Sequence, residues 1–263
     1  MKVSITLPSL FPTLLGKCLT HIRATVTGID YEVVVVSPFE VEGPDIVWVR
    51  EDRPAGNCAA HRLAYVHSSG DVIVTLSDDR LPRAGWLTAV LQDLVRRERE
   101  RPGTCLGLAH EPNILGTVFG IYYPFFPVAF RHTIERAGGY FSADFAAHFG
   151  DADLGLRIWR AGGRCLPCFD AKLDYVGLRD DVLESAHRQE KFLADMAVFV
   201  DRWKDSYGRS WSCAHPRDFN LNIYEPVFDA VLKDGTIFHN DPEFGRRIRA
   251  YYEDYKVDYR GYP

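Results

Sequence analysis

Apolar residues in the first part of the chain occur in two patterns. Val3–Leu7 and Tyr31–Val36 are short, nearly continuous apolar runs, as in strands buried on both faces. Between them, apolar residues recur at every fourth position from Leu14 to Val26, which is the spacing of one helix face. A strand, a helix and a second strand in this order predict two parallel strands joined by a helix.

The same alternation continues along the chain to about residue 103. Strands are predicted at Ile46–Val49 and Asp71–Leu76, with a helix between them from about Asn57 to Ser68. A further helix is expected to begin near Pro82, because proline is favoured in a first helical turn, and to end at Pro102-Gly103. The repeated order predicts an α/β protein whose central sheet is mostly parallel.

The second half of the chain is less regular. Glycine and proline interrupt residues 104–130, which suits strands and loops that line a pocket. Gly150–Gly163 predicts a helix with two aspartates in its first turn and two glycines after its last. One more helix is expected at about Val182–Trp203, before a tail rich in tyrosine and arginine. We therefore predict an α/β domain over residues 1–178, with a helical extension over residues 179–263 packed on it.

Composition indicates a globular protein and narrows its partners. The 263 residues are 46% hydrophobic and 25% charged, which is enough for a full core. No run approaches the roughly 20 apolar residues that span a bilayer, and the N-terminus has the pattern of a strand, so a cytoplasmic protein is expected. The net charge of -5 gives no general attraction to nucleic acid, although the basic clusters Arg96–Arg101 and Arg246–Arg249 permit local contacts. Cys165 and Cys168 form one CxxC pair, which lacks the second ligand pair of a zinc site.

Two adjacent carboxylates follow the strand predicted at Asp71–Leu76. Asp78 and Asp79 come after Ser77 at the carboxyl end of that strand. Two like charges this close cost about 1–4 kcal/mol unless a cation offsets them, and a divalent metal that carries a phosphate ligand is one candidate. The alternative is a solvated turn in which one aspartate caps the helix expected near Pro82.

Four segments of the chain match, in order, the motifs of a known family. They are Pro8-Ser9 at the end of the first strand, Gly56–Ala64 at a helix start, Leu76–Asp79, and Ala137–Tyr140 followed by Gly150–Leu154. With these segments the chain resembles the family 2 glycosyltransferases, which use nucleotide sugars and have the GT-A fold, from about Val3 to Tyr175. The resemblance implies a Rossmann-like, mostly parallel sheet flanked by helices. It also implies transfer of a sugar from a nucleoside diphosphate to an acceptor hydroxyl.

The resemblance implies roles for three aspartates. Asp79 stands where the family's metal-binding aspartate lies, whereas Ser77 replaces the first aspartate of that DxD motif and Asp78 takes the middle position. One carboxylate completed by water and phosphate oxygens suits Mg2+ or Mn2+. Asp151 matches the catalytic base of an inverting, single-displacement reaction. Asp153 would point about 200° away from it around the helix and cannot reach the same hydroxyl.

The expected nucleotide pocket departs from the family pattern. Family members commonly carry an aspartate after the second strand to contact the base, whereas here Val36 is followed by Ser37. Asp52 and Arg53, after the third strand, are then candidates for contacts to the base, ribose or diphosphate, and an ordinary surface loop is the alternative. The donor is expected to be a UDP, GDP or dTDP sugar. Its expected contacts are Pro8, Ser9, Ser37, Asp52, Arg53, Gly56, Arg62 and Asp78.

The acceptor site and the third metal ligand have weaker signals. Candidates for the acceptor are Trp86, His148 and Asp153, with a core tryptophan and a surface histidine as the ordinary alternatives. The family often has a metal-binding histidine after the strand that follows the base. No histidine stands there in this chain, so the substitutes are Asp174, His187 and His215.

Three other functions stay compatible with the sequence. A nucleotidyltransferase of the same fold would need a glycine- and arginine-rich loop after the first strand, where this chain has Pro8–Pro12. Hydroxymethylated DNA is an alternative acceptor that the basic clusters permit and the acidic total does not favour. A catalytically inactive nucleotide-sugar-binding module would bind the donor without turnover.

Overall fold

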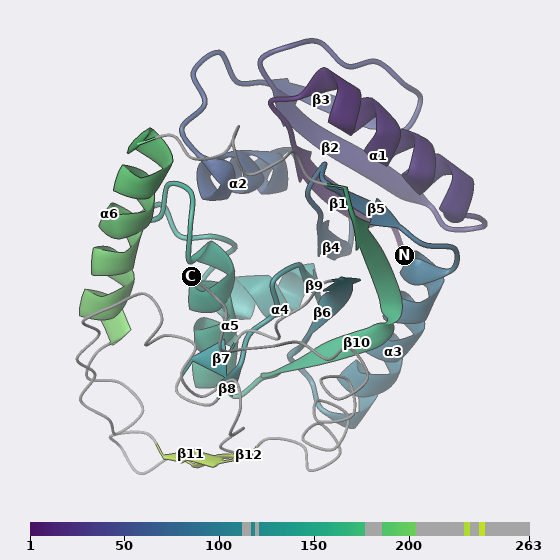
Figure 1. The fold of residues 1–263 in the computed structure, drawn as a ribbon. Helices are drawn as coiled ribbons and strands as arrows, with labels where there is room; N and C mark the ends of the chain where they lie inside the picture. Colours follow the sequence, from purple (N-terminus) through teal and green to yellow (C-terminus); the bar gives the residue numbers. More distant parts are fainter. Residues whose placement is uncertain (112–116, 119–120, 177–185, 204–228, 232–236, 240–263) are drawn as a thin grey trace.

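An eight-stranded sheet forms the core of the computed structural model, which describes residues 1–111, 117–118, 121–176, 186–203, 229–231 and 237–239 (Figure 1). The sheet has the order β3-β2-β1-β4-β9-β6-β10-β5. Its strands are β1 (Val3–Pro8), β2 (Tyr31–Ser37), β3 (Ile46–Arg50), β4 (Val72–Thr75), β5 (Arg80–Pro82), β6 (Thr104–Glu111), β9 (Pro127–Phe130) and β10 (Arg164–Tyr175). Two short pairs lie outside it: β7 (Thr117–Val118) with β8 (Ile121–Tyr122), and β11 (Asp229–Val231) with β12 (Ile237–His239).

Helices cover both faces of this sheet, which confirms the predicted α/β class. They are α1 (Pro12–Thr25), α2 (Asn57–His67), α3 (Trp86–Glu100), α4 (Arg131–Arg136), α5 (Gly150–Arg160) and α6 (Ala186–Trp203). The helices α1 and α3 lie on one face, and α2, α4 and α5 lie on the other (Figure 1). Within the described chain, no helix has the length and apolar character needed to cross a membrane.

The sheet is mixed. Strands β3, β2, β1 and β4 pair in parallel, as do β6 and β10, whereas β9 and β5 run antiparallel to their neighbours. The parallel half brings the carboxyl ends of β1, β2 and β3 and the chain after β4 to one edge. Ligands of open α/β sheets bind at such an edge.

The helix expected near Pro82 begins later. Arg80–Pro82 is strand β5, with Leu81 opposite Asp174 of β10, and the backbone N–H of Val176 donates to the Asp79 carbonyl at 2.9 Å. Pairing with β10 therefore overrides the preference of proline for a first helical turn. Helix α3 starts at Trp86, after Gly85 with a φ of 78°.

The C-terminal helix is docked on the rest of the fold by charged side chains. Its predicted start at Val182 lies outside the described residues, and α6 is described from Ala186. Buried Asp195 of α6 accepts hydrogen bonds from the backbone N–H groups of Ala146, Ala147 and His148, at 2.7–3.0 Å. The loop that leads into α5 is thus held by the side chain of a helix far along the chain.

Candidate functional site

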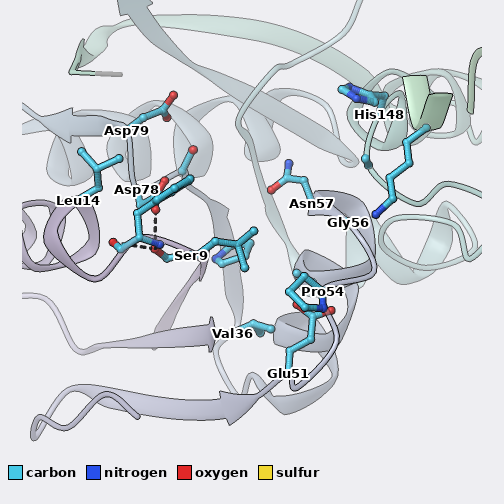
Figure 2. A pocket seen from close by; sticks show the side chains of 17 residues that line it. Ser9, Leu14, Val36, Glu51, Pro54, Gly56, Asn57, Asp78, Asp79 and His148 are labelled. Atoms are coloured by element: carbon cyan, nitrogen blue, oxygen red, sulfur yellow. Dashed lines mark hydrogen bonds between the residues drawn. The ribbon is translucent and has the colours of Figure 1, made fainter. Parts of the chain in front are cut away.

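A cavity of about 490 Å3 lies at the carboxyl ends of the parallel strands (Figure 2). Its lining comes from the end of β1 and the start of α1, the end of β2, the loop between β3 and α2 with the start of α2, the turn after β4, the loop before α5, and α6. They include Pro8, Ser9, Gly56, Asp78, Asp79 and His148 from the predicted site. Figure 2 shows the two aspartates on one side of the cavity, opposite Gly56 and His148.

Asp78 is fixed to the end of β1. Its carboxylate accepts a hydrogen bond of 2.5 Å from the Ser9 hydroxyl, whose oxygen also accepts one from the Phe11 backbone N–H at 3.0 Å. Asp78 is 8% exposed, and its burial, with a smaller contribution from the neighbouring carboxylate of Asp79, raises its pKa to about 6. Asp78 therefore has a set orientation before any ligand binds.

Asp79 has an oxygen at the same corner that is ion-paired with Arg80 but accepts no hydrogen bond from the described residues. Its side chain is 29% exposed, and within the described chain its buried Oδ1 atom accepts no hydrogen bond. The Nε atom of Arg80 lies 3.8 Å away, and the Arg80 guanidinium stacks over the ring of Tyr175 at 4.1 Å. A buried carboxylate oxygen without a hydrogen-bond donor suits a cation brought by a ligand. The described residues contain no cluster of three metal-ligating side chains, so water or phosphate oxygens would have to complete a metal site here.

Asp151 lies in the first turn of α5, close to the start of α2. Gly150 packs so tightly on Cys58 of α2 that an added Cβ would lie 2.8 Å from its sulfur. Asp151 does not line the cavity itself, although Ala147 and His148 just before it do. Its carboxylate is partly buried and accepts a hydrogen bond from the Ala152 N–H at 2.9 Å. Burial raises its pKa to about 7, a value suited to a base near neutral pH.

Asp153 is wrong as an acceptor residue, because its carboxylate is used inside the protein. It is fully buried, and its two oxygens pair with the guanidinium groups of Arg157 and Arg202, each at 2.8 Å. The indole N–H of Trp203 adds a hydrogen bond of 3.1 Å. The expectation that Asp151 and Asp153 point in different directions agrees with these contacts. Asp153 joins α5 to α6.

Two further predicted site residues belong to the core. Trp86 is fully buried and donates from its indole N–H to the Thr25 hydroxyl at 3.2 Å, so it cannot contact an acceptor. Ser37 is also fully buried; its hydroxyl donates to the Phe39 carbonyl at 2.5 Å and accepts from the Trp48 indole at 3.0 Å. Neither lines the cavity.

The loop after β3 reaches the cavity through residues other than the predicted ones. Asp52 pairs with Arg50 at 2.5 Å on the surface, and neither Asp52 nor the exposed Arg53 lines the cavity. Glu51 and Pro54 do. Arg62 is likewise absent from the lining, and its guanidinium donates to the Ser142 carbonyl at 3.1 Å.

The predicted third metal ligand is occupied elsewhere. Asp174 accepts a hydrogen bond of 2.8 Å from Arg83, which holds the pKa of the Asp174 carboxyl below its usual value, and Asp174 does not line the cavity. Asp174 therefore has an arginine partner in this structure and lies outside the cavity lining. His215 and the side chain of His187 lie outside the described residues.

Two further polar residues that line the cavity are not among the predicted site residues. Asn57, the first residue of α2, lies beside Gly56. Lys191 reaches the cavity from α6, and its amino group donates to the Ala55 carbonyl at 3.0 Å. Asn57 lies within the Gly56–Ala64 motif, although no role is expected for it. Lys191 has no motif beside it, so only the tertiary structure brings it to the site.

Comparisons with known proteins agree with this architecture. No family model matches the chain, and no curated protein matches it in sequence. Similar solved structures include mannosyltransferase PcManGT from Pyrobaculum calidifontis in complex with GDP-Man and Mn2+ (TM-score 0.58, 21% identity, 76% of this chain and 64% of that chain). GalNAc-T7 with UDP, GalNAc and Mn2+ matches with a TM-score of 0.58 and 12% identity over 78% of this chain and 49% of that chain. S. aureus TarS 1-349 with UDP-GlcNAc matches with a TM-score of 0.56 and 11% identity over 76% of this chain and 67% of that chain. The chain thus spans less than two thirds of the first two proteins, and it shares the GT-A fold of these glycosyltransferases.

Proposed function

We propose that the chain is a metal-dependent, inverting glycosyltransferase that moves a sugar from a nucleoside-diphosphate sugar to an acceptor hydroxyl. The observation that carries this proposal is the Asp79 carboxylate, with a buried oxygen that accepts no hydrogen bond from the described residues, at the sheet edge of a GT-A fold. The resemblance to family 2 supports the same position. The catalytic domain would cover residues 1–178, with the C-terminal part packed on it.

In this proposal the two adjacent aspartates hold the metal corner. Asp79 would ligate Mn2+ or Mg2+, and Asp78, oriented by Ser9, would help through a second oxygen or a bound water. When bound, the ion offsets the negative charge that develops on the leaving diphosphate. Mn2+ is present in the structures of PcManGT and GalNAc-T7, which supports a divalent ion of this kind here.

Asp151 would act as the general base. Its carboxylate would take the proton of the acceptor hydroxyl while that oxygen forms a bond to the anomeric carbon. The bond from the anomeric carbon to the diphosphate oxygen breaks on the opposite face, so the sugar is inverted in one step and the diphosphate leaves with the electron pair. His148, which lines the cavity three residues before this base, is the retained candidate for an acceptor contact.

The proposed donor contacts are those predicted residues that line the cavity. Pro8, Ser9, Gly56 and Asp78 meet this condition, and Glu51 replaces Asp52 as the acidic group after β3. The bound nucleotides of the similar structures, GDP-Man and UDP-GlcNAc, support a GDP or UDP sugar.

A DNA acceptor has little support on the described surface. Arg96 pairs with Asp93 and with Glu100, and Arg97 pairs with the same Asp93 at 3.0 Å. These arginines are largely neutralised by their own helix, so they provide little attraction for phosphate. The second basic cluster, Arg246–Arg249, lies outside the described residues.

A donor panel tests the proposal directly. UDP-, GDP- and dTDP-sugars would be incubated with the wild-type chain with and without Mn2+, and released nucleoside diphosphate and product would be measured. Metal-dependent turnover of one donor, lost in Asp151→Asn with donor binding retained, is the expected result. Binding without turnover in the wild type would instead indicate the inactive binding module. Absence of both binding and turnover for every donor would refute the proposal.

A further inference from the structure

Helix α6 places a lysine in the wall of the cavity. Lys191 is the one lysine or arginine among the described residues that line it, and three carboxylates, those of Glu51, Asp78 and Asp79, line it as well. The amino group of Lys191 has three N–H donors. In the described chain one of them is used, in the bond to the Ala55 carbonyl.

The same helix is held rigidly at this point. Asp195, four residues later and on the same face of α6, accepts the three N–H groups of residues 146–148. Phe192 packs its ring against His148 and Phe149, with centroid distances of 5.2 and 5.3 Å. Lys191 therefore enters the cavity from a fixed base, and its terminal amine is the part that can move between Ala55 and a ligand.

The charges that line the cavity indicate which part of a donor Lys191 would bind. A cavity with three carboxylates and one ammonium group has an excess of negative charge, and a nucleoside diphosphate would add more. A metal ion at Asp79 offsets part of this charge on one side. A base or ribose offers neutral groups, whereas phosphate oxygens form the stronger, charge-assisted hydrogen bonds with an ammonium group.

We propose that Lys191 is a donor-binding residue that donates to a phosphate oxygen of the nucleoside-diphosphate sugar, across the cavity from the metal corner. The inference rests on the function proposed above and adds α6 to the donor site. It predicts a penalty on binding that depends on the number of phosphates in the ligand, which a purely structural role for Lys191 would not produce.

The test compares Lys191→Met with a matched control, Lys17→Met. Methionine keeps most of the length of lysine without its charge, and Lys17 is an exposed lysine on α1 that does not line the cavity. Titration calorimetry with Mn2+ would measure binding of uridine and guanosine, their monophosphates and their diphosphates to the full chain. For Lys191→Met we expect unchanged nucleoside binding and about 10- to 100-fold weaker diphosphate binding, with the monophosphates between them.

Each outcome decides a separate point. Diphosphate binding by Lys191→Met within about twofold of wild type, as for Lys17→Met, overturns the role of Lys191 and leaves the proposed function intact. Equal losses for nucleosides and diphosphates also overturn it, because they indicate damage to the cavity wall. If the wild-type chain binds none of these ligands, the proposed function fails and this inference fails with it.

Discussion

Replacing Asp151 with asparagine should abolish transfer and at the same time stabilise the folded chain above neutral pH. Burial raises the pKa of Asp151 from 3.8 to about 7, so ionising this group is harder in the folded chain than in the unfolded one. A change of that size corresponds to at most about 4 kcal/mol. Because the side chain is partly exposed and solvent screens it, we expect about 1–3 kcal/mol of stabilisation in Asp151→Asn.

The sign of this effect depends on pH. Between the unfolded pKa of 3.8 and the folded value of about 7, the folded wild type keeps a proton that the unfolded chain has released. The contribution of Asp151 to wild-type stability therefore falls as pH rises through this window, and its full cost is present above it. Asparagine does not titrate, so the gain should be largest near pH 8 and disappear near pH 4.

Asp153→Asn is the matched control, because it makes the same chemical change two residues further along α5. The fully buried Asp153 carboxylate compensates Arg157 and Arg202, so its neutralisation leaves two cations without their partner. We expect a loss of about 2–4 kcal/mol, opposite in sign to the effect at Asp151. Urea unfolding of the three proteins at several pH values measures both. A less stable Asp151→Asn near pH 8, or a gain that does not change with pH, would refute the reasoning.

Three other predictions use the same site. The rate of transfer at low acceptor concentration should rise with an apparent pKa of about 7 as Asp151 loses its proton, and a flat profile between about pH 5.5 and 8.5 would contradict its role as base. Asp79→Ala should weaken nucleotide binding about tenfold or more with Mn2+ and leave it unchanged without metal. The control Asp174→Ala should bind the nucleotide as wild type does. If calorimetry finds no metal-dependent loss of nucleotide affinity in Asp79→Ala, Asp79 is not a metal ligand. Gly56 has a φ of 136°, and an added Cβ would lie 2.4 Å from a backbone oxygen, so Gly56→Ala should lose about 1–3 kcal/mol in thermal unfolding. Gly16→Ala, with open space around it, should gain up to about 1 kcal/mol, and equal behaviour of the two variants would disprove the steric argument.

Three of the predicted site residues that meet in the cavity, Ser9, Asp78 and Asp79, follow the ends of adjacent parallel strands. Ser9 follows β1, and Asp78 and Asp79 follow β4, which pairs with β1 in parallel. The carboxyl ends of parallel strands lie at the same edge of a sheet. Residues directly after these ends therefore lie close together, whatever conformation the following loops take. This is why the pattern of apolar runs was enough to bring these groups together.

The errors concern the direction of side chains at the same edge. Ser37, predicted to follow the strand Tyr31–Val36, is the last residue of β2, and its hydroxyl bonds inward to the backbone and to Trp48. In the next loop Glu51 faces the cavity and Asp52 faces solvent. In a loop no regular alternation sets the direction of side chains, so two adjacent acidic residues give no sequence signal for which of them faces the cavity.

Helix α6 carries inward-facing charged side chains beside its apolar face, on which Phe199 and Trp203 are fully buried. Lys191, Asp195 and Arg202 lie on one stripe of the helix and face the protein, whereas Leu193 and Val198 are 48% and 36% exposed. The inward-facing charges pair with buried polar groups of the rest of the fold. Asp195 accepts hydrogen bonds from three N–H groups before α5, and Arg202 pairs with the carboxylate of Asp153.

The contacts from α6 are required at the backbone before α5, which is strained. Phe149, the residue before α5, has a φ of 63°, in the left-handed region that is costly for a residue other than glycine. Such a conformation persists because neighbours fix it, and here the neighbours are Asp195 on the preceding amides and Phe192 and Phe199 against the ring. The position of Asp151 therefore depends on α6. The proposed catalytic domain of residues 1–178 therefore relies on the C-terminal part packed on it, because α6 supplies the contacts that hold the loop before the proposed base.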